Sequence, residues 1–110
     1  MTIDNLNSVD FISLPKDNKI DAVLSIVDHL DWSNEESHLK LIQSKVYRYL
    51  DFIESGEIYK EYPDAKSRKF TIEISGLYPL TIKGKELINA LTNYLAEQNY
   101  ILKWKNLKTK

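Results

Sequence analysis

The fold is decided by one stretch, FTIEISGLYPLTIKGKELINALTNYLAEQNYILKW, residues 70–104. Apolar and polar residues alternate at both of its ends, from Phe70 and from Tyr100, and a period of two is typical of a half-buried strand. Between these ends, apolar residues recur every three or four positions after Thr81, whose hydroxyl suits a helix N-cap. The predicted buried stripe of this helix is Leu87, Ile88, Leu91, Tyr94 and Leu95. The stretch therefore predicts a strand, a helix and a second strand.

Two more strands are predicted upstream. Residues 9–14 form a short apolar run that Pro15 ends, because proline has no backbone N–H to donate to a sheet. Asp17 and Asn18 tolerate the backbone of a tight turn, so we expect a hairpin to the next run. That run, residues 20–30, carries apolar side chains on both faces and predicts a strand that is at least partly covered on both.

A long helix is predicted between these strands and residue 70. Ser33 and Glu36 have the spacing of a capping box, in which a serine and a glutamate satisfy each other's backbone amides. Gly56 is expected in the left-handed turn that ends the helix. The predicted buried stripe is Leu39, Ile42, Val46, Tyr49, Leu50 and Ile53. Residues 57–69 have little periodicity and contain Pro63, and they predict a loop.

The order of elements is β-β-α-β-α-β, which predicts an α+β fold. A two-layer sandwich, with both helices on one face of a four-stranded sheet, buries both helical stripes and the apolar strand faces. The order of the strands within the sheet cannot be derived from the pattern. The length of 110 residues predicts a single domain over residues 1–110, with residues 1–7 and 106–110 flexible.

Composition narrows the class of protein. The chain has no cysteine, which excludes disulfides and thiolate metal sites and suits a reducing compartment. Its start lacks the basic and apolar regions of a leader, and no apolar stretch approaches the roughly 20 residues of a membrane span. We therefore expect a cytoplasmic protein with no membrane partner.

Charge is distributed unevenly along the chain. Residues 1–64 hold 13 acidic and 6 basic side chains, whereas residues 65–110 hold 3 acidic and 9 basic ones. Such an asymmetry suggests a polar partner, unless the fold mixes the two halves on one surface.

One segment gathers possible metal ligands: Asp28, His29, Asp31, Glu35, Glu36 and His38. Their spacing matches no known metal site, and carboxylates are common at helix starts because they favour the positive end of the helix dipole. The three glycines are isolated, so no phosphate-binding loop is present, and we find no nucleophile motif. We expect no cofactor, no metal and no enzymatic activity.

A nucleic-acid site would rest on basic residues near Lys66, Arg68 and Lys69, and on residues 103–110. There lysines could neutralise phosphates and Trp104 could stack on a base. The sequence pI of about 6.1 and the lack of any known DNA-binding pattern make this partner the less favoured one.

The strongest candidate for a binding surface is the segment of residues 57–64. It combines tyrosines with acidic side chains, and exposed tyrosines are frequent interface anchors. These tyrosines could instead fold back onto the end of the sheet. Trp32 could likewise be an exposed anchor, or it could pack against the first turn of the helix as a hydrophobic staple. The predicted partner-binding residues are Trp32, Glu57, Tyr59, Glu61, Tyr62 and Asp64.

Several segments resemble a family of small uncharacterised bacterial proteins classed as a domain of unknown function. These segments are residues 3–5, 9–13, 26–32, 52–59 and 62–65. The resemblance implies a bacterial source and a single-domain layout, and it transfers no catalytic residue. Where that family commonly has an Asp-Gly turn, this chain has Asp17 and Asn18.

These observations favour a non-catalytic protein-binding module. An immunity protein, which blocks a toxin domain by placing acidic side chains against a basic surface, is the leading hypothesis. The alternative is a housekeeping or regulatory domain that self-associates as a homodimer, through a sheet edge or an exposed helix face.

Overall fold

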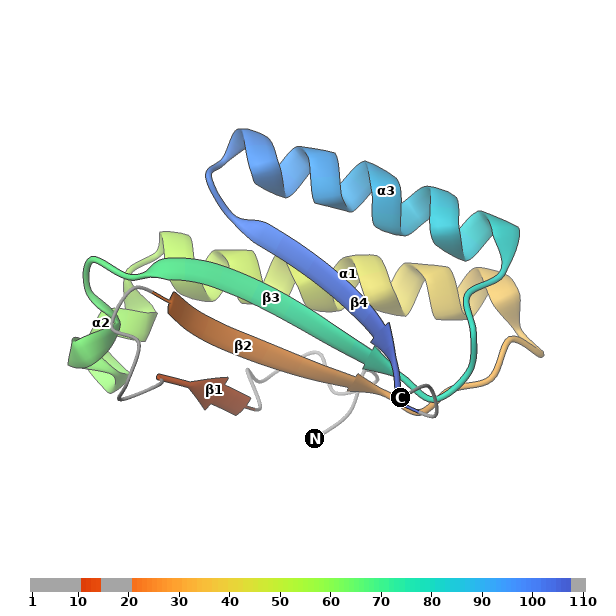
Figure 1. Cartoon of the computed structure of the whole chain (residues 1–110), viewed down its shortest axis with the longest axis horizontal. Helices are drawn as coiled ribbons and strands as arrows, with labels where there is room; N and C mark the ends of the chain where they lie inside the picture. The colour runs from red at the N-terminus through yellow and green to blue at the C-terminus, as the bar shows by residue number, and fades with distance from the viewer. Residues whose placement is uncertain (1–10, 15–20, 108–110) are drawn as a thin grey trace.

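The computed structural model describes residues 11–14 and 21–107. The predicted order of strands and helices is confirmed, with a short extra helix and a 3-10 turn between α1 and β3 (Figure 1). The elements are β1 (Phe11–Ser13), β2 (Asp21–Asp28), α1 (Glu35–Glu54), α2 (Glu57–Glu61), η1 (Pro63–Ala65), β3 (Lys69–Gly76), α3 (Ile82–Glu97) and β4 (Ile101–Asn106).

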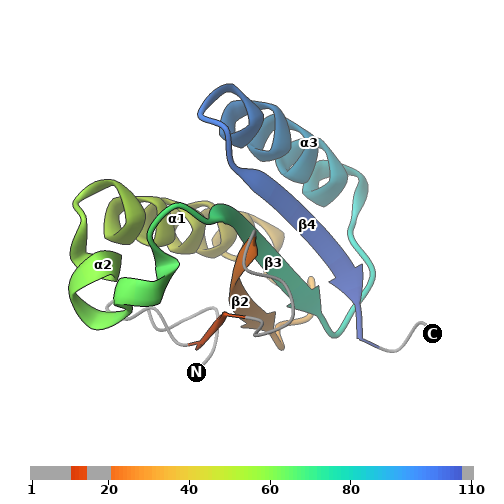
Figure 2. The ribbon, with the colours of Figure 1, turned by 60° about the vertical axis from the view of Figure 1, so that its left-hand side comes forward.

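The four strands form one sheet in the order β1-β2-β3-β4. The first pair, β1 and β2, is antiparallel, whereas β2, β3 and β4 are parallel to one another. Each helical crossover moves the chain one strand further in the same direction, so a common handedness places α1 and α3 on one face. Figures 1 and 2 show this two-layer arrangement, as the sequence predicted.

The core lies between the sheet and the two long helices. Leu24 of β2 is in register with Ile72 of β3, which is in register with Leu102 of β4, and all three side chains are buried. The helices cover this row with most of their predicted stripes, including Ile42, Val46, Tyr49, Leu50 and Ile53 of α1 and Ile88, Leu91 and Leu95 of α3.

Strand β3 is more deeply buried than the alternation predicted. Thr71 and Ser75, on the face that the helices do not cover, are only 6% and 8% exposed. The reason is topological, because β3 lies between β2 and β4 and side chains of both neighbours flank its polar face. A polar residue type therefore does not imply an exposed position in a central strand.

The predicted capping box at the start of α1 is wrong. The N-cap is Asn34, whose side chain accepts a hydrogen bond from the Ser37 amide, and the helix begins at Glu35. Ser33 instead donates through its amide and its hydroxyl to the Asp31 carboxylate, at 3.1 and 2.7 Å. This local turn occupies the serine side chain and moves the helix start by one residue.

The predicted loop of residues 57–69 is also wrong in part. Gly56 has the predicted left-handed backbone, with φ of 83°, but the chain then forms α2 and η1 before it enters β3. Ile58 and Ala65 are fully buried and attach these short elements to the core. Burial of two apolar residues in an otherwise polar segment stabilises turns that have no periodicity of their own.

Helix α3 begins as predicted, with the Thr81 hydroxyl accepting from the Gly84 amide at 3.0 Å. Tyr94 was predicted in its buried stripe but is 44% exposed, because its ring leans towards α1 on the outer surface. Asn106, predicted to be flexible, is the last residue of β4. The predicted hairpin turn and the flexible ends 1–7 and 108–110 lie outside the described residues.

Candidate functional site

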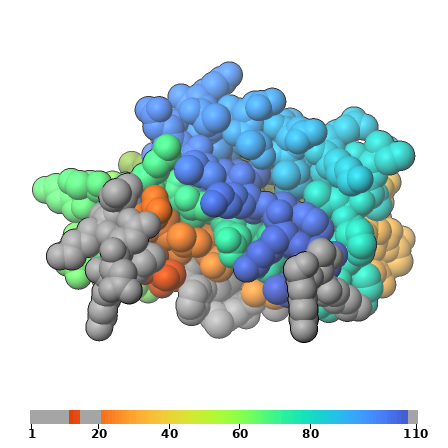
Figure 3. Space-filling view, in the orientation of Figure 1, coloured from red at the N-terminus to blue at the C-terminus, as the bar shows by residue number. Residues whose placement is uncertain are grey.

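Five of the six predicted partner-binding residues are exposed and lie close together in the chain, on α2, on η1 and at the residue between them. We call them the acidic tyrosine surface, which is defined as Glu57, Tyr59, Glu61, Tyr62 and Asp64. The side chains of Tyr59 and Tyr62 are 39% and 38% exposed, and the three carboxylates are exposed. Figure 3 shows this segment, in green, projecting at one end of the molecule. Acidic and aromatic groups are thus presented together to solvent.

The backbone under this surface is held by several contacts. The Tyr62 amide donates to the Ile58 carbonyl at 2.7 Å, which closes the turn between α2 and η1. Arg68 donates from Nε to the Asp64 carbonyl and from Nη1 to the Asp21 carbonyl, both at 2.9 Å. Arg68 therefore fastens η1 to the start of β2, so the surface is attached to the sheet rather than carried on a free loop.

Tyr59 combines the two alternatives considered for it. Its ring lies 6.3 Å from that of Phe70, which in turn lies 6.2 Å from Tyr100, so one side of Tyr59 packs on the end of the sheet. The remaining part of the ring is exposed. Burial raises the pKa of the Tyr100 phenol, and the nearby charges of Glu54 and ionised Tyr59 add to this effect. A partly packed, partly exposed ring suits a preorganised interface anchor.

Trp32 lies apart from the other five residues. It precedes the first turn of α1, whereas α2 follows the last turn, and a helix of 20 residues is about 30 Å long. Figure 3 shows the start of α1, in amber, at the opposite end of the molecule from α2. The Trp32 ring is half-buried and stacks on His38, with ring centroids 3.8 Å apart. The structure therefore does not bring Trp32 to the acidic tyrosine surface.

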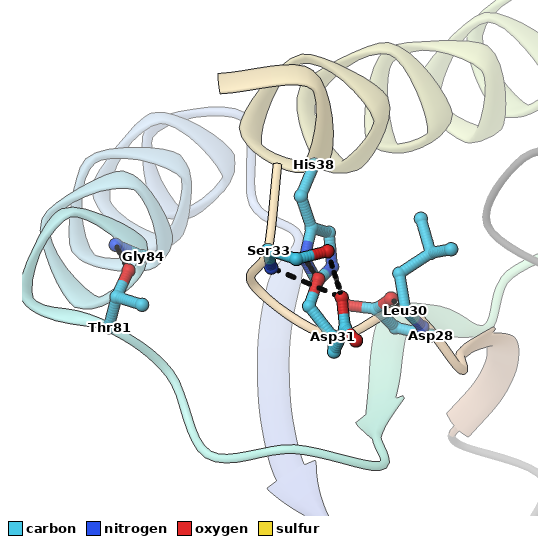
Figure 4. A network of polar contacts seen from close by, with 7 residues as sticks. All are labelled: Asp28, Leu30, Asp31, Ser33, His38, Thr81 and Gly84. Carbon is cyan, nitrogen blue, oxygen red and sulfur yellow. Dashed lines mark hydrogen bonds and ion pairs between the residues drawn. The ribbon is translucent and has the colours of Figure 1, made fainter. Parts of the chain in front are cut away.

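His38 and Asp28 form a buried pair that the sequence analysis missed. His38 Nε2 lies 2.5 Å from Asp28 Oδ2, and Nδ1 lies 3.0 Å from the Asp31 carbonyl (Figure 4). Since a carbonyl only accepts, Nδ1 carries a proton. The side chains of the pair are 2% and 3% exposed. The available clue was spacing, because His38 precedes buried Ile42 by four residues and thus continues the apolar stripe of α1.

This buried pair lies where parallel sheets usually place ligand sites, at the carboxyl ends of the strands. Both His38 nitrogens and both Asp28 oxygens are nevertheless bonded within the protein, the second oxygen by the Leu30 amide at 3.2 Å. The indole N–H groups of Trp32 and Trp104 are buried without a hydrogen-bond partner, and neighbouring atoms cover them. The pair therefore joins α1 to β2 and has no free atom for a substrate.

The other residues that were considered as possible metal ligands do not converge. His29 is exposed, and the Asp31 carboxylate is engaged by Ser33, whose hydroxyl and amide lower the pKa of Asp31, with a smaller contribution from His38. Within residues 11–14 and 21–107, no three His, Cys, Asp or Glu side chains converge as a metal ion requires.

The basic residues of the second half do not form one surface either. Lys66 follows η1 and Lys69 begins β3, whereas Lys105 lies near the end of β4 and pairs with Glu73 at 3.1 Å. Trp104 packs its indole over Gly76, so close that a Cβ on Gly76 would lie 2.7 Å from Trp104 Cζ2. The ring that could have stacked on a base is thus turned into the core.

Fold and surface together define a small α+β sandwich with an exposed acidic and aromatic surface at one end. The chain belongs to the family of unknown function DUF6572, which it matches over residues 1–108. No curated protein and no solved structure matches the chain. In the described part of the chain, no helix has the length and apolar character needed to cross a membrane.

Proposed function

We propose that this protein is a non-catalytic module that binds another protein through the acidic tyrosine surface. The observation that carries the proposal is the exposure of Tyr59 and Tyr62, at 39% and 38%, among three exposed carboxylates. Tyrosine contributes a large contact area with little loss of rotamer freedom, which is why it is frequent in binding surfaces.

The chemistry of the surface indicates the class of partner. Carboxylates around an aromatic centre attract a basic surface, accelerate encounter and disfavour acidic competitors. A toxin domain with a basic active site has such a surface, and the proposed role is that of a bacterial, cytoplasmic immunity protein that covers it. Arg68 and buried Ile58 support this role, because a preorganised surface loses less conformational freedom on binding.

The proposal is tested with the full chain immobilised and exposed to lysate of the organism that encodes it. We expect one basic protein to be retained by the unmodified chain and lost with Tyr59→Ala combined with Tyr62→Ala. Retention should fall as salt is raised, because exposed charges are screened beyond about 10 Å at 0.1 M salt. Co-expression should then relieve any toxicity of the retained protein.

A matched control is Tyr47→Ala combined with Tyr94→Ala. It removes two exposed tyrosines of similar exposure, 46% and 44%, from the helix layer. The proposal requires the partner to remain bound to this control. If no protein distinguishes the unmodified chain from the Tyr59 and Tyr62 variant, the proposed function is wrong.

A further inference from the structure

The two polar contacts of the buried His38 ring place conflicting demands on its protons. Nδ1 lies 3.0 Å from the Asp31 carbonyl, which can only accept a hydrogen bond, so Nδ1 carries a proton. Nε2 lies 2.5 Å from Oδ2 of the Asp28 carboxylate, which is also an acceptor (Figure 4). A neutral imidazole has one N–H and can donate to only one of these oxygens. A ring that makes both contacts therefore needs a second proton.

Burial makes this conflict costly. The side chains of His38 and Asp28 are 2% and 3% exposed, so solvent does not separate the two groups. The other carboxylate oxygen already accepts a hydrogen bond from the Leu30 amide at 3.2 Å, which holds the carboxylate in place. Without a second proton on the pair, two lone pairs would face each other in a buried site, and unsatisfied buried polar atoms are destabilising. A proton between Nε2 and Oδ2 removes the conflict.

The contacts of the ring favour this proton on the imidazole. Trp32 stacks on His38 with ring centroids 3.8 Å apart, and the face of an indole attracts a cation. The positive end of the α1 dipole opposes a cation at this position, but it amounts to only a partial charge. The Asp28 carboxylate is a full charge in direct contact with Nε2, so its attraction is the larger effect.

The other charged groups around the ring do not reverse this preference. The elements around it are β2, the connection to α1, the first turn of α1 and, next to Trp32, the start of α3, where a Cβ on Gly84 would lie 3.1 Å from the indole. The position of β3 beside Asp28 is the uncharged Gly76. The described charged or titratable side chains of these elements near the ring are Asp28, His29, Asp31, Glu35, Glu36, Lys83 and Lys85. Carboxylates outnumber lysines among them, which favours an imidazolium.

We propose that His38 carries a proton on both ring nitrogens in the folded protein, and that its pair with Asp28 is a pH-sensitive contact between the start of α1 and the end of β2. The second proton lets one ring bond both the Asp28 carboxylate and the Asp31 carbonyl. When it is lost, one of these contacts becomes repulsive and the first turn of α1 loses a connection to β2. The pair is at the opposite end of α1 from α2, and the inference does not depend on the proposed function.

The sign of the pH dependence follows from the number of bound protons. An imidazole in an unfolded chain loses its proton near about pH 6.5. Above this pH the folded protein holds one proton more than the unfolded chain. The contribution of the pair to stability is therefore complete below about pH 6.5 and is lost as pH rises to the value at which the folded pair releases its proton. Over this interval the unfolding equilibrium constant should rise about tenfold for each pH unit.

Nuclear magnetic resonance of the isotope-labelled full chain measures the protonation state directly, from the chemical shifts of the imidazole nitrogens. The chain has two histidines, so exposed His29 is an internal reference, and His29→Gln assigns the signals. At about pH 7.5 we expect both nitrogens of His38 to be protonated and His29 to be mostly neutral. An unprotonated Nε2 on His38 at this pH would overturn the inference.

Urea denaturation of the full chain between about pH 7 and about pH 9 measures the linked proton. The unmodified chain and the His29→Gln control should both show the steep rise of the unfolding equilibrium constant. His38→Gln removes the titrating ring, and Asp28→Asn removes the charge that holds the proton, so each should reduce the slope by about one proton. In Asp28→Asn, the His38 ring should have only one protonated nitrogen.

The two measurements are independent of each other. The resonance experiment uses the unmodified chain, so it decides the protonation state even if a substitution at the buried pair prevents folding. Circular dichroism verifies that each variant is folded before its slope is compared. An equal slope in the unmodified chain and in folded His38→Gln would show that the pair holds no extra proton, and the inference would be wrong.

Discussion

At the scale of single residues, His38 holds the first turn of α1 against the end of β2. Its ring bonds Asp28 on one side and the Asp31 carbonyl on the other, and Trp32 stacks on its face. Every polar atom of this buried pair is satisfied, so the contact orients two elements without leaving a free group.

Removal of Asp28 should therefore be strongly destabilising. Asp28→Ala leaves the buried Nε2 of His38 and the Leu30 amide without their hydrogen-bond partner, and we expect a loss of about 3 kcal/mol in the free energy of unfolding. Urea denaturation measures it. His38→Ala combined with Asp28→Ala should lose less than the sum of the single changes. Strict additivity would contradict a direct coupling.

Gly76 has a steric role that can be tested in the same way. A Cβ at this position would lie 2.7 Å from Trp104 Cζ2 and 2.9 Å from Nε1. Gly76→Ala should lower the free energy of unfolding by about 2 kcal/mol, because the partly buried indole packs against the core and cannot move away freely. With Trp104→Leu present, the same Gly76→Ala change should be better tolerated. An equal loss in both backgrounds would show that the indole is not the cause.

Tyr100 should make the protein sensitive to high pH. Because the pKa of Tyr100 is raised in the folded state, by burial first and then by Glu54 and Tyr59, the folded chain holds this proton more tightly than the unfolded chain. The contribution to stability is complete below the unfolded pKa of about 10 and is lost as pH rises through the folded value. Tyr100→Phe should therefore lose less stability than the unmodified chain above about pH 10. Parallel pH profiles of the two chains would contradict this account.

At the scale of elements, β4 is an edge strand of the described sheet. Its face away from the helices presents Lys103 and Lys105, and lysines on an edge oppose pairing with another chain. Edge protection explains why an alternating, otherwise apolar strand carries two lysines, so these residues need no nucleic acid to account for them.

Loss of this protection should promote aggregation. Lys103→Val makes the edge strand more apolar and raises its strand propensity, so light scattering on mild heating should begin at a temperature several degrees lower. Lys85→Val makes the same change on an exposed helical position of α3, and it should have little effect. Equal aggregation of the two variants would mean that general hydrophobicity, and not the strand edge, is responsible.

The elements also show where local sequence rules succeed and fail. Periodicity located all four strands and both long helices, because each buries a regular face. It failed at α2 and η1, where two buried residues, Ile58 and Ala65, stabilise turns with no repeating pattern. The capping-box pattern misplaced the start of α1, because the Ser33 hydroxyl donates to the Asp31 carboxylate and does not cap the helix.

At the scale of the whole molecule, the acidic tyrosine surface and the exposed tyrosines of the two long helices lie on different elements. Tyr47 of α1 and Tyr94 of α3 contact each other, whereas the acidic tyrosine surface follows the end of α1. Lys40→Glu, which reverses an exposed charge in the first half of α1, should therefore leave partner capture unchanged. Loss of capture in this variant would mean that the acidic tyrosine surface alone does not account for binding.

The sequence by itself determined the order of the elements and the face that most of them bury, because these depend on periods of two and 3.6 residues. The tertiary structure decided the strand order β1-β2-β3-β4, the burial of Thr71 and Ser75, and the pairing of Asp28 with His38. It also separated Trp32 from Tyr59 by the length of α1. The physical reason is that these features depend on which distant segments lie side by side, and residue patterns along the chain report only on near neighbours.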